Sequence, residues 1–169
     1  MGVAGLSGAS ALGASSMPAG GAVHVFVQPS SGATDKILIT GAVGDYGTAL
    51  SENKNGKPNA NNGDFAYVKL TQGSFEVNKT KLQAAGNKAT PSYDKSTCSF
   101  SFSASAPVTF ADGTGLYKGI SGTVMITESY GGIGSRYTSG AKKGLCNTSN
   151  NAPLAAQLGT VEGTGTVKF

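Results

Sequence analysis

The stretch that decides the fold runs from Gly113 to Thr127 and reads GTGLYKGISGTVMIT. Four glycines, spaced two to four residues apart, are interleaved with and followed by apolar and β-branched residues, a pattern that predicts a strand with bends. A glycine inside a strand marks a bulge, a tight bend or a close approach of two backbones. Because a flat sheet cannot close on itself, repeated glycine bends indicate a sheet that curls.

Two further segments show strand periodicity on either side of this stretch. From Cys98 to Ala106 every even-numbered position is Cys, Phe or Ala, and every odd-numbered position is Ser. Strict alternation of this kind predicts a half-buried antiparallel strand. From Val161 to Phe169, Val, Gly and Phe alternate with Thr, Glu and Lys. Because an unpaired strand edge promotes aggregation, this last strand is expected to close the sheet.

The remaining segments complete an all-β pattern. Apolar alternation predicts earlier strands at residues 23–27, 36–40, 65–70 and 75–77. Asn78 is expected to cap a short helix from Lys79 to Ala85 that stops at Gly86. Polar loops are expected at residues 51–64, with turns at Asn55–Gly56 and Asn62–Gly63, and at 136–151. Seven or eight strands with almost no helix favour a closed antiparallel barrel, with a β-sandwich as the alternative.

Length and composition indicate one domain, expected at residues 23–169, after a leader. The chain has 169 residues, 13% of them charged, and a net charge of +4. Its 12 lysines and single arginine are scattered, whereas nucleic-acid binders cluster basic residues on one face, so no nucleic-acid partner is expected. No apolar run approaches the ~20 residues of a transmembrane helix. Residues 1–22 are small and uncharged, typical of either a signal-peptide remnant, with Ala9–Ala11 as its cleavage motif, or a flexible mature leader.

Three runs resemble a known superfamily. They are GTGLYKGISGTVMITE at 113–128, ITGAVGDYGTA at 39–49 and GTVEGTGTVKF at 159–169. They are similar to the allene oxide cyclase-like and dirigent-like barrels, and more narrowly to the secreted, uncharacterised actinobacterial branch. The resemblance implies an eight-stranded antiparallel β-barrel, secretion or a cell-surface location, an apolar cavity and self-association. It does not assign an activity, because one fold hosts many functions.

The two cysteines, Cys98 and Cys146, allow two interpretations. With no C-x-x-C motif and one histidine, a zinc site lacks ligands, so no metal is expected. If the protein is exported, a single disulfide is favoured, and in the chain-entropy model a bridge across about 48 residues contributes roughly 4 kcal/mol. The alternative is a buried thiol at Cys98 on the apolar face of its strand.

Four residues are weak candidates for catalysis. Asp45 and Tyr46 follow a glycine bend, where a carboxylate serves either as an acid or base or as a hydrogen-bond acceptor that fixes the bend. Glu128 shares a face with Val124 and Ile126 if the strand stays regular, and Arg136 is then a candidate partner for it across a turn. The alternative is that the strand bends at Gly131 and exposes Glu128.

No known motif for cofactor or metal chemistry is present. The sole histidine, His24, has no nucleophile motif near it, and the Asn-rich loop lacks acidic residues at the first positions of a calcium loop. No cofactor is therefore expected. Three hypotheses remain: a secreted barrel that binds a small apolar ligand, a cofactor-independent isomerase or cyclase that shapes a substrate in its cavity, and a structural surface module. A hollow interior of about 300 Å³ or more with convergent polar groups would favour the isomerase.

Overall fold

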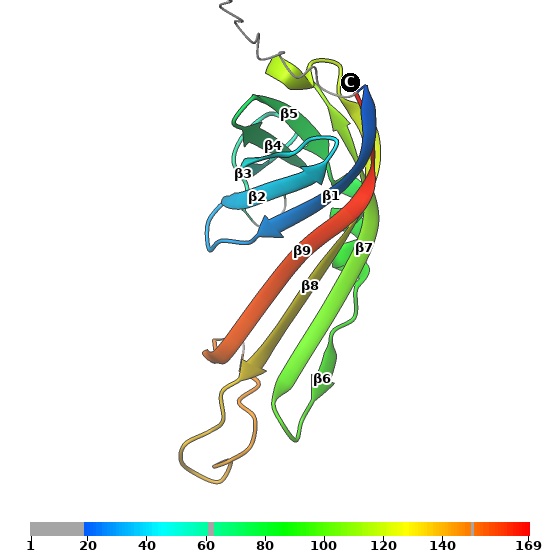
Figure 1. Ribbon diagram of the computed structural model, residues 1–169. Helices are drawn as coiled ribbons and strands as arrows, with labels where there is room; N and C mark the ends of the chain where they lie inside the picture. Colours follow the sequence, from blue (N-terminus) through cyan, green and yellow to red (C-terminus); the bar gives the residue numbers. More distant parts are fainter. Residues whose placement is uncertain (1–18, 61–62, 150) are drawn as a thin grey trace, which may run out of the picture.

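The computed structural model describes residues 19–60, 63–149 and 151–169. Most of the expected leader, residues 1–18, and Asn62 of the second turn pair lie outside the described residues. Within the described chain the fold is all-β with one short α-helix (Figure 1). The elements are β1 (Gly20–Gln28), β2 (Thr34–Gly41), β3 (Asp45–Glu52), β4 (Phe65–Leu70), β5 (Gly73–Asn78), α1 (Thr80–Lys88), β6 (Ser92–Asp94), β7 (Ser99–Ala111), the 3-10 turn η1 (Gly115–Tyr117), β8 (Ser121–Gly134) and β9 (Leu154–Lys168).

Eight of these strands close into an antiparallel barrel. The hydrogen-bonded order is β5-β4-β3-β2-β1-β9-β8-β7, and β5 pairs with β7 through Glu76↔Ala111, Val77↔Phe110 and Asn78↔Thr109. Strand β9 is paired on both edges, with β1 and with β8. The barrel prediction is therefore confirmed, and the sandwich alternative is wrong because the sheet returns to its own first edge.

Alternate residues of the eight barrel strands point into the barrel interior. Val25, Ile39, Val68, Val108 and Val124 are all buried, and each is flanked along its strand by more exposed neighbours. β1 begins at Gly20, earlier than the predicted start at Val23. α1 begins at Thr80 and ends at Lys88, later than predicted at both ends, and Lys79 stands at its N-cap position. Leu82 of α1 is buried with the core.

One end of the barrel is plugged by the connection between β7 and β8. The first half of the fold-deciding stretch is this connection rather than a strand, because η1 occupies residues 115–117 and β8 starts at Ser121. Tyr117 is fully buried and packs edge-on against Phe75, with ring centroids 5.6 Å apart. At Gly113 a Cβ atom would lie 1.8 Å from the Tyr117 carbonyl oxygen, so only glycine fits there.

At the other end β7, β8 and β9 continue past the barrel as a projecting ribbon (Figure 1). The β1 partners of β9 begin at Val161, whereas β8 pairs with β9 as far as Leu154. β6 adds to the free edge of β7 through Ser92↔Ser101 to Asp94↔Ser99. The sequence pattern did not predict this extension.

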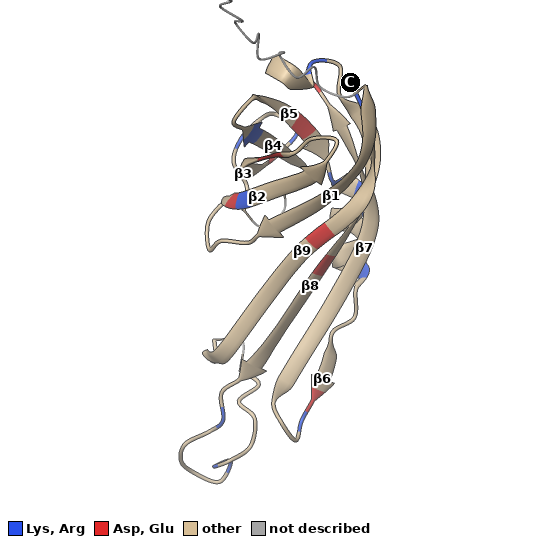
Figure 2. Ribbon diagram, in the orientation of Figure 1, with Lys and Arg blue, Asp and Glu red and all other residues tan. Residues whose placement is uncertain are grey.

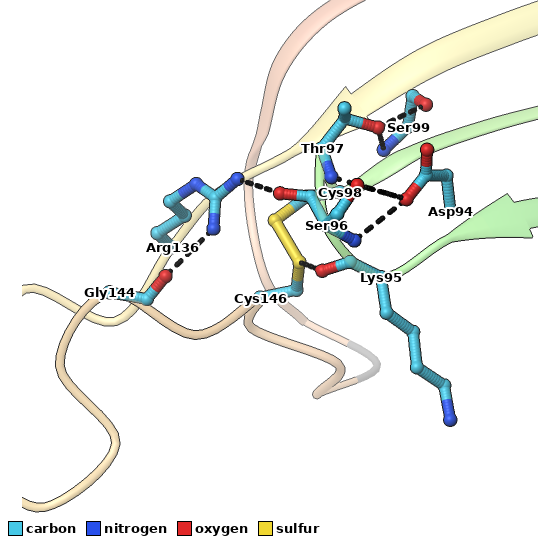
Figure 3. Close-up of a disulfide and its surroundings, with 9 residues drawn as sticks. All are labelled: Asp94, Lys95, Ser96, Thr97, Cys98, Ser99, Arg136, Gly144 and Cys146. Carbon is cyan, nitrogen blue, oxygen red and sulfur yellow. Dashed lines mark hydrogen bonds between the residues drawn. A yellow bond between two sulfur atoms is a disulfide. The ribbon is translucent and has the colours of Figure 1, made fainter.

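The predicted disulfide joins Cys98 to Cys146 at the tip of the ribbon (Figure 3). The Cα atoms of the two cysteines lie 5.4 Å apart, and the bridge ties the β6–β7 turn to the loop between β8 and β9. The free-thiol alternative for Cys98 is therefore wrong. A disulfide indicates an oxidising compartment.

Candidate functional site

A cavity of about 370 Å³ occupies the open end of the barrel, opposite the plug formed by η1. Most of its lining is aliphatic or aromatic, and helix α1 contributes Leu82 and Gln83 to it. The apolar lining residues that face the core are Val25, Ile37, Ile39, Ala49, Val68, Val108, Phe110 and Ile126. The barrel is thus hollow at this end, with a volume at the low end of known ligand pockets.

Three charged side chains line this cavity: Asp35 of β2, Lys79 before α1 and Glu128 of β8. Each is partly buried. Ser51 of β3 lies among them and accepts a hydrogen bond from Lys79 Nζ at 3.0 Å. The open end therefore combines apolar walls with a small cluster of opposite charges.

Lys79 reaches the cavity because of its place at the junction of β5 and α1. It lies two residues after Val77, which also lines the cavity, so it keeps the inward direction of the strand. Its backbone N–H donates to the Asp64 carbonyl at 2.8 Å, and its carbonyl accepts the Gln83 N–H at 2.9 Å as the first turn of α1 forms. Burial lowers the pKa of the Lys79 amine, while Glu128, Asp35 and Asp64 partly oppose this effect.

Glu128 follows Ile126 by two residues on β8 and shares its inward face, as the alternation predicted. Burial raises the pKa of the Glu128 carboxyl, and the negative charge of Asp35 adds to this, whereas the Lys79 cation lowers it. The alternative that Glu128 is released to solvent is not what the structure shows, because β8 continues regularly to Gly134.

Asp45 lies at the plugged end, away from the cavity, and is only 3% exposed. Its carboxylate accepts hydrogen bonds from Tyr46 N, Thr71 Oγ1, Gln72 N and the Tyr117 hydroxyl. Burial alone would raise the pKa of Asp45, but the hydrogen bonds outweigh it and hold that pKa below its ordinary value. This geometry joins the β2–β3 bend to the β4–β5 turn and to η1.

Tyr46 and Arg136 do not join Glu128. Tyr46 is 64% exposed on the outer surface. Arg136 lies at the tip of the ribbon, where it donates to the Gly144 carbonyl at 2.8 Å and to the Ser96 carbonyl at 2.6 Å (Figure 3). Arg136 therefore does not pair with Glu128, because β8 continues as a strand to Gly134 and carries Arg136 to the ribbon tip. His24 stacks on Phe26, with ring centroids 4.2 Å apart.

Sequence reasoning missed Lys79, Asp35 and Ser51 among the polar residues that line the cavity. The signal for Lys79 was its spacing of two residues from Val77 and four from Phe75, which places all three on one face of a strand. The expected start of a helix at Lys79 concealed this pattern. In the structure β5 continues to Asn78 and α1 begins at Thr80, and Lys79 between them lines the cavity as Val77 does.

Aromatic residues extend the cavity onto the projecting ribbon. Phe102 of β7 and Tyr130 of β8 line the cavity rim, and their ring centroids are 5.7 Å apart. Phe100, two residues farther from the barrel on β7, lies 5.8 Å from Tyr130. The Tyr130 hydroxyl donates to Gln157 Oε1 of β9. The apolar surface thus continues from the barrel interior onto the ribbon along strand β7.

Charge is sparse on the strands that form this surface (Figure 2). β7 contains no charged residue, and β8 contains only Glu128. In the part of the chain that the structure describes, no group of three or more His, Cys, Asp or Glu side chains could hold a metal ion. None of the helices within the described ranges has the length and apolar character needed to span a bilayer.

Comparison of the chain with protein-family models, with curated proteins and with solved structures finds no match. Of the resemblance inferred from the sequence motifs, the eight-stranded antiparallel barrel is shown by the structure, and no family is identified.

Proposed function

We propose that this protein is a secreted barrel that binds a small, largely apolar molecule in its open-end cavity. The observation that carries this proposal is a hollow of about 370 Å³ whose lining is mostly apolar and includes a few polar and charged groups. Ligand sites in proteins have this composition: mostly apolar lining, with a small number of polar groups that orient the ligand. The disulfide and the expected secretion agree with a function outside the reducing cytosol.

The polar groups of the cavity define the end of the ligand that they would contact. Lys79 Nζ and Ser51 Oγ offer hydrogen bonds to a hydroxyl or carbonyl oxygen, while Glu128 and Asp35 disfavour a second anion. The ligand class that fits is a neutral molecule with an apolar body and one oxygen function. A charged carboxylate ligand would add a third negative charge to a cavity whose lining already includes Glu128 and Asp35.

A cavity-filling variant tests the proposal. Ala49 is buried and lines the cavity, so Ala49→Leu should reduce its volume, whereas Ala84→Leu on the exposed side of α1 should not. Binding is followed by fluorescence of N-phenyl-1-naphthylamine, a neutral apolar probe. We expect the probe to bind the natural protein and Ala84→Leu alike and Ala49→Leu much more weakly, with folding of each variant checked by circular dichroism. Equal binding by all three proteins would contradict the proposal.

A second candidate function is cofactor-independent isomerisation or cyclisation within the same cavity. The specific observation that favours it is Glu128, a carboxyl in a largely apolar cavity, whose pKa burial raises above its ordinary value, as in carboxyl groups that act as general acids. The sequence resemblance to the allene oxide cyclase-like and dirigent-like barrels supports the same candidate. If it is correct, Glu128→Gln should abolish turnover of a bound substrate while leaving probe binding within a few fold.

A structural role in assembly is the third candidate. Phe26, Leu38 and Tyr46 are exposed and lie directly opposite one another across β1, β2 and β3. Such a row of apolar side chains on the outer surface suits contact with a second copy of the chain. Light scattering of the purified protein tests this candidate, and a monomer at all accessible concentrations would argue against it.

A further inference from the structure

We propose that Lys79 captures an apolar aldehyde in the barrel cavity as a Schiff base. This inference rests on the proposed function, because it requires that the cavity admit a small apolar molecule. It adds a chemical class of ligand, an aldehyde, and a covalent step at a named atom, Lys79 Nζ.

The first support is the position of the amine. Lys79 Nζ lies in a cavity with aliphatic walls, and Ser51 Oγ holds it by a hydrogen bond of 3.0 Å. An aldehyde whose apolar body lies against the aliphatic walls would place its carbonyl group near the polar residues of the lining, Lys79 among them. Surface lysines lack such an enclosure, because their amines are surrounded by water.

The second support is the protonation state that the enclosure favours. Only a neutral amine attacks a carbonyl carbon. Burial lowers the pKa of Lys79 and so favours its neutral form. The charged groups that interact with it come from three elements: Glu128 on β8, Asp35 on β2 and Asp64 before β4, and all three oppose the shift without reversing it. A larger neutral fraction at pH 7 is the expected result.

The third support is a carboxyl in the same cavity. Glu128 lines the cavity together with Lys79, and burial raises its pKa and so favours its protonated form. A protonated carboxyl can donate its proton to the leaving hydroxyl of a carbinolamine. Loss of that hydroxyl is the acid-catalysed step of imine formation.

The reaction balances without an outside oxidant or reductant. The nitrogen lone pair forms the new C–N bond, the carbonyl oxygen takes up a proton, and the nitrogen loses one, which gives a carbinolamine. The C–O bond then breaks, the hydroxyl leaves as water with a proton from Glu128, and the nitrogen gives up its remaining proton to restore the Glu128 carboxyl. The sum is aldehyde plus amine giving imine plus water.

The test compares two lysines on one polypeptide. The full chain with its disulfide intact is incubated at pH 7 with octanal and sodium cyanoborohydride, and modification at each lysine is followed by peptide mass mapping. Lys81, which is exposed on the first turn of α1, is the internal reference. We expect Lys79 to be modified severalfold faster than Lys81, and octan-1-ol, which cannot form an imine, to protect Lys79 alone.

Variants separate the covalent step from simple binding. Lys79→Arg keeps the positive charge and should remove the fast modification while Lys81 still reacts slowly. Glu128→Gln should slow capture at Lys79 while the slow modification of Lys81 stays unchanged. Modification of Lys79 no faster than that of Lys81 would overturn the inference, and if octan-1-ol still displaced the probe, the proposed function would stand. Failure of both octanal and octan-1-ol to displace the probe would overturn the inference and the proposed function together.

Discussion

Lys79 and Glu128 enter the same apolar cavity from distant parts of the sequence, one at the β5–α1 junction and the other on β8, and each shifts the pKa of the other. Burial disfavours the charge of both groups, while their mutual attraction favours it. The open end of the barrel therefore combines two titratable groups whose charge burial disfavours, in contrast to the plugged end.

Glu128→Gln should change how stability depends on pH. Because the folded-state pKa of Glu128 is raised, the folded protein keeps this proton above pH 4.5, where the unfolded chain has begun to lose it. Stability from this group is complete at low pH and is lost as pH rises through the folded-state pKa. The free energy of unfolding of the variant minus that of the natural protein should therefore be more favourable at pH 7 than at pH 4. Urea unfolding at both pH values measures this difference.

The control for this prediction is Glu162→Gln, because Glu162 is exposed on the neighbouring strand β9. Its stability relative to the natural protein should be similar at the two pH values. The prediction for Glu128 would be contradicted if the free energy of unfolding of Glu128→Gln, relative to the natural protein, were also the same at the two pH values.

At the plugged end, Tyr117→Phe should destabilise the protein. The variant removes the hydroxyl that donates to the buried Asp45 carboxylate, and a hydrogen bond to a charged group contributes about 1.5–3 kcal/mol. Tyr46→Phe is the matched control, since the Tyr46 ring is exposed and its loss of a hydroxyl should cost less than about 0.5 kcal/mol. Chemical unfolding of both variants measures the difference, and equal stability would show that Asp45 does not need Tyr117.

Acid should weaken the same cluster. The folded-state pKa of Asp45 lies below its ordinary value, so its contribution is complete at neutral pH and is lost as pH falls through that pKa. The stability deficit of Asp45→Asn should consequently be large at pH 7 and should shrink in strong acid. A deficit that stays constant down to low pH would contradict this assignment.

The strands were predictable where period-two alternation is strong. In β7 the alternation of Ser with apolar residues from Cys98 to Ala106 determines which side chains face inward, and the structure confirms it at Ala104 and Ala106. The ribbon was not predictable, because Leu154 to Gln157 alternate weakly and do not differ in composition from a loop. Whether a strand ends at the barrel rim depends on the strands that pair with it, and a local sequence pattern carries no information about them.

The candidate site was predictable only in part for a related reason. The inward position of Glu128 follows from its alternation with Val124 and Ile126. Which charged residue lies near it depends on where β8 and β5 end. Arg136 was expected across a turn from Glu128, whereas β8 continues for six residues from Glu128 to Gly134, about 20 Å at the usual strand rise. Lys79 enters the cavity because β5 keeps its direction for one residue more than expected.

Reduction of the disulfide should loosen the ribbon tip and leave the cavity intact. The bridge closes a separation of 48 residues, for which the chain-entropy model gives roughly 4 kcal/mol. Cys98 and Cys146 lie outside the cavity lining, so probe binding should persist below the melting temperature. Thermal unfolding with and without dithiothreitol measures the effect. The double variant Cys98→Ser/Cys146→Ser should melt low in both conditions, and sensitivity of that variant to reductant would point to another cause.

The curling of the sheet should depend on the glycines of β9, and Gly165→Ala tests this directly. A Cβ atom at Gly165 would lie 2.2 Å from the Thr123 carbonyl oxygen and 2.6 Å from Val124 Cα on β8, so the two strands would have to separate. Forcing extra volume into a packed position costs about 1–3 kcal/mol.

Gly86→Ala on α1 is the matched control, because nothing lies within 4 Å of its added Cβ, and alanine in a helix is more favourable than glycine by roughly 0.5–1 kcal/mol. We therefore expect opposite signs from the same chemical change, measured as the free energy of unfolding in urea. If Gly165→Ala were as stable as the natural protein, the close approach of β8 and β9 would not be what bends this side of the barrel.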